Sequence, residues 1–196
     1  MIANVASPRI SKRQRPWPAQ LMYSRERSGV TEALDPIPLL RFLEERGVEH
    51  IVIGGFAVNA HGFIRASKDL DIVPDPSQAN LGKLAVALRE LNAKNAEGED
   101  FDDHEFPLDP ASVEDLAQGG NFRLETDLGG LDIMQWIAGL DADNPYAELA
   151  DQAIEGQPDG VRVRICSLEH LRAMKRAAGR PRDLDDLAHL PETNDT

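Results

Sequence analysis

The sequence predicts an α/β (α+β) protein in which helices flank a mixed β-sheet and a helical segment follows the sheet. Short apolar runs typical of strands alternate with segments of helical spacing, in the order β-α-β-α-β-β-α-β-α-α. One pair of expected strands is joined by a short turn containing glycine, which is typical of a hairpin. The sheet should therefore contain antiparallel as well as parallel neighbours.

The expected elements begin with a helix within residues 35–47, where Gly47 provides a stop signal. A buried strand follows at 48–53 and ends at Gly54-Gly55, after which we expect a short helix at 56–61. A second strand at 68–73 alternates polar and apolar residues. Ser77 can cap the next helix, 78–91.

The second half begins with an acidic stretch, 95–119, that holds one short helix near 112–118. Strands at 121–126 and 131–136 form the hairpin around 127–130, and a last strand is expected at 161–165. Two helices then follow. Helix 168–178 is capped by Ser167 and ended by Gly179, and Pro181 opens helix 182–190.

Composition and charge limit the function. The 196 residues are 41% hydrophobic, enough for a core, and no uncharged apolar run approaches the ~18 residues of a membrane span. One cysteine, Cys166, cannot form an intrachain disulfide, so we expect a cytoplasmic protein without a membrane partner. The net charge is −19 over residues 28–160 and +5 over each of 1–27 and 161–183. Nonspecific wrapping of nucleic acid is thereby excluded, whereas divalent cations fit the acidic centre.

Three regions are expected. Residues 1–30 contain prolines and basic side chains without apolar periodicity, and we expect a disordered basic tail there. Residues 31–166 form the core, and the helices within 167–196 pack on it.

Three aspartates carry the chemistry that we expect. Asp69 and Asp71 lie two residues apart on a strand, so their carboxylates share one face with Cα atoms about 6–7 Å apart. A divalent cation between them would relieve their repulsion. Asp132 interrupts an otherwise apolar strand, which is costly unless the carboxylate is paired or binds a metal. A solvated strand edge is the structural alternative for Asp69 and Asp71.

Gly54 and Gly55 lie between a strand and a helix, where glycine lets a backbone approach a ligand closely. A tight strand-to-helix turn would explain them equally well. The order Gly54-Gly55, Asp69-Leu-Asp71 and a later strand Asp132 resembles the nucleotidyltransferase fold of the polymerase-beta superfamily. The segment 167–186 is similar to the C-terminal part of bacterial AbiEii-like nucleotidyltransferases, many of which are toxins of toxin–antitoxin pairs. Many of those members carry Ser at the position of Gly55, which here offers only its backbone N–H.

The resemblance implies an NTP substrate and Mg²⁺ or Mn²⁺ held by Asp69, Asp71 and Asp132. Asp132 would also help to activate an acceptor hydroxyl, on an RNA such as tRNA, on a protein or on a small molecule. A cognate antitoxin is a further implied partner. Within this resemblance, Gly54 and Gly55 would contact the nucleotide.

Basic residues supply the remaining candidates. Arg172, Lys175 and Arg176 share one face of a helix at spacings of three and four, which is also typical of a solvated face. The resemblance places Lys175 on the triphosphate. Further phosphate or acceptor contacts are implied for the basic side chains Arg65, Lys68, Arg180 and Arg182. Asp183 would orient a basic partner, and Asp185 and Asp186 are interpreted as surface charges.

Two other interpretations remain. Asp69-Leu-Asp71 also matches the nucleophile motif of haloacid-dehalogenase-type phosphatases, but that motif follows an apolar strand and residues 65–68 are polar. The stronger alternative is a catalytically silent member of the nucleotidyltransferase fold that acts as a binding module. We expect Cys166 in the core, and Phe122 and Trp136 packed in the hairpin.

Overall fold

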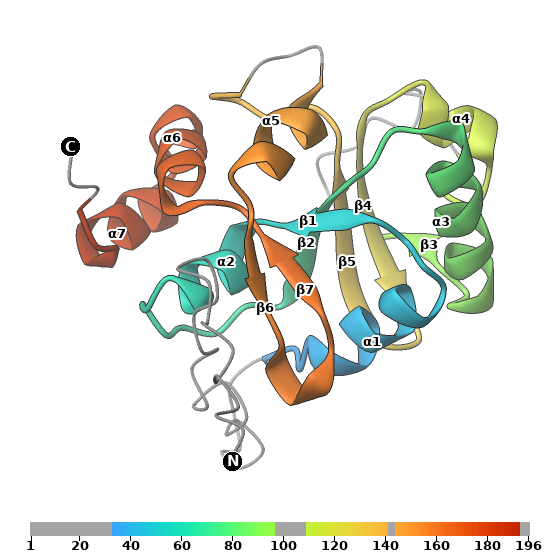
Figure 1. Cartoon of the computed structure of the whole chain (residues 1–196), viewed down its shortest axis with the longest axis horizontal. Coiled ribbons are helices and arrows are strands. Elements are labelled where there is room, and N and C mark those ends of the chain that lie inside the picture. Colours follow the sequence, from blue (N-terminus) through green and yellow to red (C-terminus); the bar gives the residue numbers. More distant parts are fainter. Residues whose placement is uncertain (1–32, 97–108, 141–143, 193–196) are drawn as a thin grey trace, which may run out of the picture.

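The computed structural model describes residues 33–96, 109–140 and 144–192. The predicted tail, 1–30, and residues 97–108 of the acidic stretch lie outside these residues. The described part forms a seven-stranded mixed sheet in the order β3-β4-β5-β2-β1-β7-β6 with helices packed around it, which confirms the predicted fold class (Figure 1).

The first half of the chain follows the expected order with one addition, the two-residue strand β3, which the sequence did not predict. Ser77 accepts a hydrogen bond from the Asn80 backbone N–H and so caps α3, as predicted. Helix α2 begins at Gly54 itself rather than after the glycine pair. The elements are α1 (Ile37–Glu45), β1 (His50–Val52), α2 (Gly54–Ala60), β2 (Asp69–Pro74), α3 (Gln78–Glu90) and β3 (Lys94–Asn95).

The second half contains two elements to which no residues were assigned, α5 and β6. Both are short, so their apolar patterns are too brief to distinguish from loop. Ser167 caps α6 and Gly179, with a left-handed φ of 61°, ends it, as predicted. The elements are α4 (Val113–Ala117), β4 (Asn121–Thr126), β5 (Gly129–Met134), α5 (Pro145–Asp151), β6 (Ile154–Gly156), β7 (Val163–Ile165), α6 (Leu168–Ala178) and α7 (Pro181–His189).

Strand pairing determines which side chains share a face of the sheet. β2 runs parallel to β5 and antiparallel to β1, and β4 and β5 form the predicted antiparallel hairpin. Leu70, Ile72, Leu131 and Ile133 are fully buried in the core. Because side chains alternate along a strand, the aspartates of β2 and β5 project from the opposite face.

The C-terminal helices lie at the β6–β7 end of the sheet beside α2, and α3 and α4 lie at the other end (Figure 1). His189 of α7 stacks on Phe63, with ring centroids 4.3 Å apart. Among the described residues, no helix has the length and apolar character needed to cross a membrane.

Candidate active site

The three aspartates meet at the β2–β5 pair. In the register of these parallel strands, Asp71 lies directly beside Asp132, and Asp69 lies beside Gly130. Opposed residues on paired strands point to the same face, so the three carboxylates project together. The sequence order alone could not show this adjacency, because α3 and β4 separate the two strands.

Glycines make room for two of these carboxylates. Gly54 has a φ of 61°, and a Cβ built on it would overlap the Asp71 carboxylate and lie 2.9 Å from the Asp71 Cβ. A Cβ on Gly130 would likewise overlap a carboxylate oxygen of Asp69. The Gly55 backbone N–H donates a hydrogen bond to Asp71 Oδ2 at 3.4 Å. The expected close backbone approach at Gly54 is therefore made to Asp71 within the protein itself.

The carboxylates affect one another electrostatically. Burial, followed by the nearby charges of Asp71 and Asp69, raises the pKa of Asp132 to about 7. Burial also raises the pKa of Asp71, and the hydrogen bond from Gly55 opposes that change. Within the described part of the chain, Arg123 forms an ion pair with Asp132, with Nε 4.0 Å from Oδ2. Asp132 Oδ1 is buried and has no hydrogen-bond partner among the described residues.

These features fit a hard divalent cation by their chemistry. Carboxylate oxygens are the ligands that Mg²⁺ and Mn²⁺ prefer, and a buried carboxylate oxygen without a partner is a free donor for one. The present side-chain orientations do not form a completed site, because no three His, Cys, Asp or Glu residues in the described ranges are grouped to hold a metal. The Asp71 carboxylate is turned toward Gly54 and Gly55 instead.

Comparison with solved structures identifies the architecture. The lincosamide antibiotic adenylyltransferase LnuA, solved with lincomycin bound, superposes with a TM-score of 0.53 at 18% identity, over 80% of this chain and 96% of LnuA. The chain has the nucleotidyltransferase fold. No protein-family model and no curated protein matches the sequence.

Two further structures are similar. The antibiotic-resistance factor ANT(2'')-Ia gives a TM-score of 0.47 at 19% identity, over 76% of this chain and 77% of that one. A candidate nucleotidyltransferase from Thermotoga maritima gives 0.49 at 18% identity, over 79% and 92%. The fold assignment depends on LnuA alone.

In this nucleotidyltransferase fold, α6 and α7 bring basic residues to the aspartates. Lys175 is buried, and its Nζ donates to Asp183 Oδ1 at 2.6 Å and lies 2.8 Å from Asp186 Oδ2. Arg65 donates two hydrogen bonds to Asp186. Lys175 and Arg65 both lower the pKa of Asp71 through their charges, which places them near the carboxylates.

The other predicted basic residues differ in their surroundings. Arg180 is largely exposed, lies 3.8 Å from Asp183 and acts electrostatically on Asp132. Arg182 donates to the Ala66 carbonyl oxygen at 2.6 Å. Lys68 is exposed and forms no ion pair with any side chain in the described part of the chain.

Three interpretations from the sequence are wrong. Asp186 is not a surface charge: its side chain is fully buried between Arg65 and Lys175. Arg172 does not belong to a solvated basic face, because its guanidinium binds the carbonyl oxygens at the end of α7. Trp136 is 66% exposed rather than packed in the hairpin, since the chain bends away after β5.

Two residues near the site had no signal in the sequence. Ser67 is buried, and its Oγ occupies the space that a side chain on Gly55 would need. Arg123 pairs in register with Asp132 from β4. Alternation along β4 places Arg123 on one face of its own strand, but these residues do not show that β5 is the partner strand or that Asp132 lies opposite.

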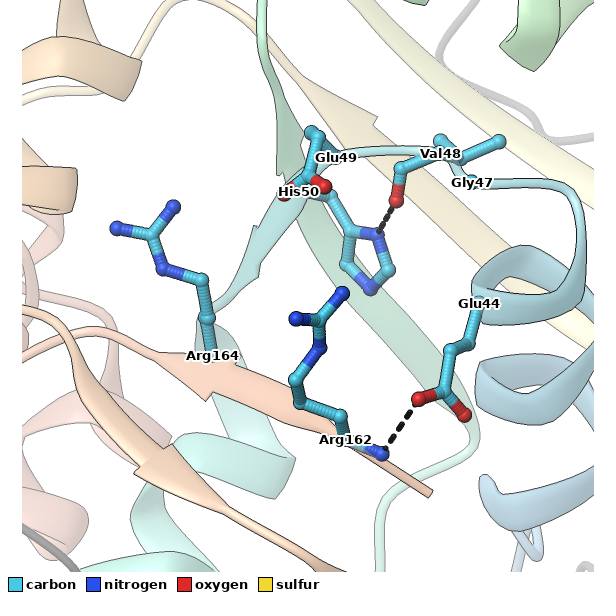
Figure 2. Close-up of a pocket in the computed structure, with 7 residues that line it drawn as sticks. All are labelled: Glu44, Gly47, Val48, Glu49, His50, Arg162 and Arg164. Atoms are coloured by element: carbon cyan, nitrogen blue, oxygen red, sulfur yellow. Dashed lines mark hydrogen bonds between the residues drawn. The ribbon is translucent and has the colours of Figure 1, made fainter.

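A small pocket lies away from this site, at the start of β1. Its volume of about 40 Å³ is that of a water-sized space and far below what a nucleotide needs. His50 Nδ1 donates to the Val48 carbonyl oxygen, and Glu44 accepts the Arg162 backbone N–H (Figure 2). Two glutamates balance the two arginines there. The pocket is lined by Glu44, Gly47, Val48, Glu49, His50, Arg162 and Arg164.

Proposed function

We propose that this protein is a nucleotidyltransferase that moves an NMP from an NTP to an acceptor hydroxyl. The observation that carries the proposal is the parallel β2–β5 register, which sets Asp71 beside Asp132 on one face with Asp69 next along β2. The nucleotidyltransferase fold supports it. Phosphoryl-type transfer requires charge neutralisation and in-line positioning, for which three convergent carboxylates are suited.

The proposal gives each carboxylate a role. Asp69, Asp71 and Asp132 would hold Mg²⁺ or Mn²⁺, which supplies positive charge against the triphosphate. Asp132 would also help to activate the acceptor hydroxyl, since it projects on the same face as Asp69 and Asp71. The absence of a Cβ on Gly54 leaves room for the Asp71 carboxylate against the backbone, where the Gly55 N–H binds it, and the carboxylate would turn toward the cation when one binds.

Basic residues would receive the phosphates. Arg65 lies over the glycine turn, and Lys175 and Arg180 are joined to it through Asp186 and Asp183, so these three would be the phosphate contacts. Gly55 and Lys68 complete the proposed nucleotide contacts. The C-terminal helices, α6 and α7, thereby form part of the proposed site together with the core.

We propose an RNA end or a protein side-chain hydroxyl as the acceptor, in the manner of an AbiEii-like toxin with a cognate antitoxin. The similarity of segment 167–186 to those proteins supports this assignment. The second candidate is a small-molecule acceptor. It is favoured by LnuA, an antibiotic adenylyltransferase of which this chain covers 96%.

The test is a transfer assay. The purified protein is incubated with each NTP radiolabelled at the α-phosphate, Mg²⁺ and total cellular RNA, beside an Asp69→Ala/Asp71→Ala control. Label on RNA with the wild type alone establishes the enzyme and its acceptor class. Label on protein directs the search to an antitoxin or to self-modification, and label on an added small hydroxyl compound supports the second candidate.

A nucleotide-dependent thermal shift separates the enzyme from a silent binding module. Asp71→Asn should abolish a Mg²⁺-dependent shift if the carboxylates hold the metal. A shift that is the same in variants of all three aspartates would remove the metal assignment, and binding without transfer to any acceptor would favour the module.

A further inference from the structure

Asp186 joins three separate parts of the chain. It lies on α7, and its carboxylate is fully buried. Arg65, from the loop after α2, donates Nε to Oδ1 at 2.6 Å and Nη2 to Oδ2 at 2.8 Å. Lys175, from α6, lies 2.8 Å from the same Oδ2. One carboxylate therefore fixes two cations that come from different elements.

Both cations are held at the candidate site. Arg65 Nη1 lies over the glycine turn, only 3.1 Å from where a Cβ on Gly55 would be. Lys175 and Arg65 are also the cations that act on the buried carboxylate of Asp71. The Asp186 ion pairs thus hold two positive charges next to the glycine turn and the first pair of aspartates.

Each cation keeps donors for a ligand. Counting partners among the described residues, Arg65 uses three of its five N–H groups, two on Asp186 and one on the Ala66 carbonyl oxygen. Counted in the same way, Lys175 uses two of its three, one on each of Asp183 and Asp186. A long basic side chain loses rotamer freedom when it binds a ligand, which weakens binding. A side chain that is already held by a buried ion pair has lost that freedom on folding, so ligand binding costs less entropy.

We propose that Asp186 is a positioning residue of the nucleotide site: it holds Arg65 and Lys175 in place so that their remaining N–H groups bind the NTP phosphates. The inference rests on the proposed function, since it takes the NTP as the ligand. Asp186 touches neither nucleotide nor acceptor and acts only through the two cations.

The test compares Asp186→Asn with Asp185→Asn. Asp185 is the neighbouring carboxylate on α7, and its side chain is 61% exposed, so the control removes the same charge without touching the anchor. Asn has no negative charge and only one acceptor oxygen, so it cannot accept both of the hydrogen bonds that Arg65 donates to the carboxylate. We expect the KM for the NTP to rise about tenfold in Asp186→Asn, with kcat reduced less, and to change less than about twofold in the control.

A merely structural role is separated by a double-variant cycle. If Asp186 acts through Arg65, the effects of Arg65→Gln and Asp186→Asn on the KM are less than additive. Additive effects, or an unchanged KM in folded Asp186→Asn, overturn the inference. Should Asp186→Asn fail to fold, Asp186→Glu replaces it: this variant keeps the charge but moves the carboxylate, so a KM equal to that of the wild type overturns the inference.

Failure of the proposed function has a different signature. A folded wild type that transfers no nucleotide and shows no Mg²⁺-dependent thermal shift with any NTP overturns both proposals. An active wild type with an unaffected Asp186→Asn variant overturns only the positioning role.

Discussion

Gly54→Ala tests the most confined contact in the candidate site. The φ of 61° at Gly54 costs an L-residue about 1–2 kcal/mol. The added Cβ also overlaps the Asp71 carboxylate and lies 2.9 Å from its Cβ, and such crowding costs about 1–3 kcal/mol more. We therefore expect the free energy of unfolding to fall by about 2–5 kcal/mol.

The chain contains a matched control. Gly179 has the same φ of 61°, but the nearest atom to a Cβ built there is the Arg176 carbonyl oxygen at 3.8 Å. Gly179→Ala should therefore cost only the backbone share, about 1–2 kcal/mol. Urea denaturation at equilibrium measures both losses. Nucleotide-dependent thermal shift should fall in Gly54→Ala alone, because the Asp71 carboxylate must move away from its position.

The Asp71→Ala background isolates the contact. Asp71→Ala removes the carboxylate but keeps the Cβ at 2.9 Å, so Gly54→Ala should then cost less than in the wild-type background while still costing more than Gly179→Ala. Equal losses for Gly54→Ala and Gly179→Ala in the wild-type background would refute the argument. So would a loss for Gly54→Ala that Asp71→Ala leaves unchanged.

Three further predictions follow from buried charges. The pKa of Asp132 is raised from 3.8 to about 7 in the folded protein, so its contribution to stability is present below about pH 4 and is lost as the pH rises through 7. Without divalent cations, the Tm should therefore fall more between pH 4 and pH 7 for the wild type than for Asp132→Asn. Lys175→Met removes one partner from each of two buried carboxylates, leaving Asp186 with Arg65 and Asp183 with the exposed Arg180. It should cost about 3–5 kcal/mol in urea denaturation, against less than about 0.5 for the exposed Arg176→Met. A similar loss in both would contradict the buried network. Arg172→Ala leaves carbonyl oxygens at the end of α7 without their donor and should lower the free energy of unfolding by about 1–2 kcal/mol. Amide hydrogen exchange in α7 should become faster, and unchanged exchange would show that these hydrogen bonds do not stabilise the helix.

Local patterns predicted most of the fold. Ser77, Ser167 and Gly179 mark helix ends through chemistry contained in a few neighbouring residues, and the structure confirms each. The alternation in β2 likewise placed Asp69 and Asp71 on one face before any partner strand was known. These features need no information about distant parts of the chain.

Long-range pairing explains what the sequence could not show. Asp186 carries no local sign that it is buried, because its partners, Arg65 and Lys175, come from other elements. Trp136 follows a strand whose pattern extends to it, but the chain bends after β5. In both cases the decisive contact or bend depends on how elements pack and not on residue type.

The parallel pairing of β2 with β5 also bears on how the protein folds. Asp71 and Asp132 meet only after α3, β3, α4 and β4 have been traversed, whereas β1 and β2 are close in sequence and flank α2. Pairs with large sequence separation close a long loop and form slowly. A nascent chain that has made only the β1–β2 pair would carry Asp69 and Asp71 without the third carboxylate, so any activity at this site must wait for the centre of the sheet to assemble.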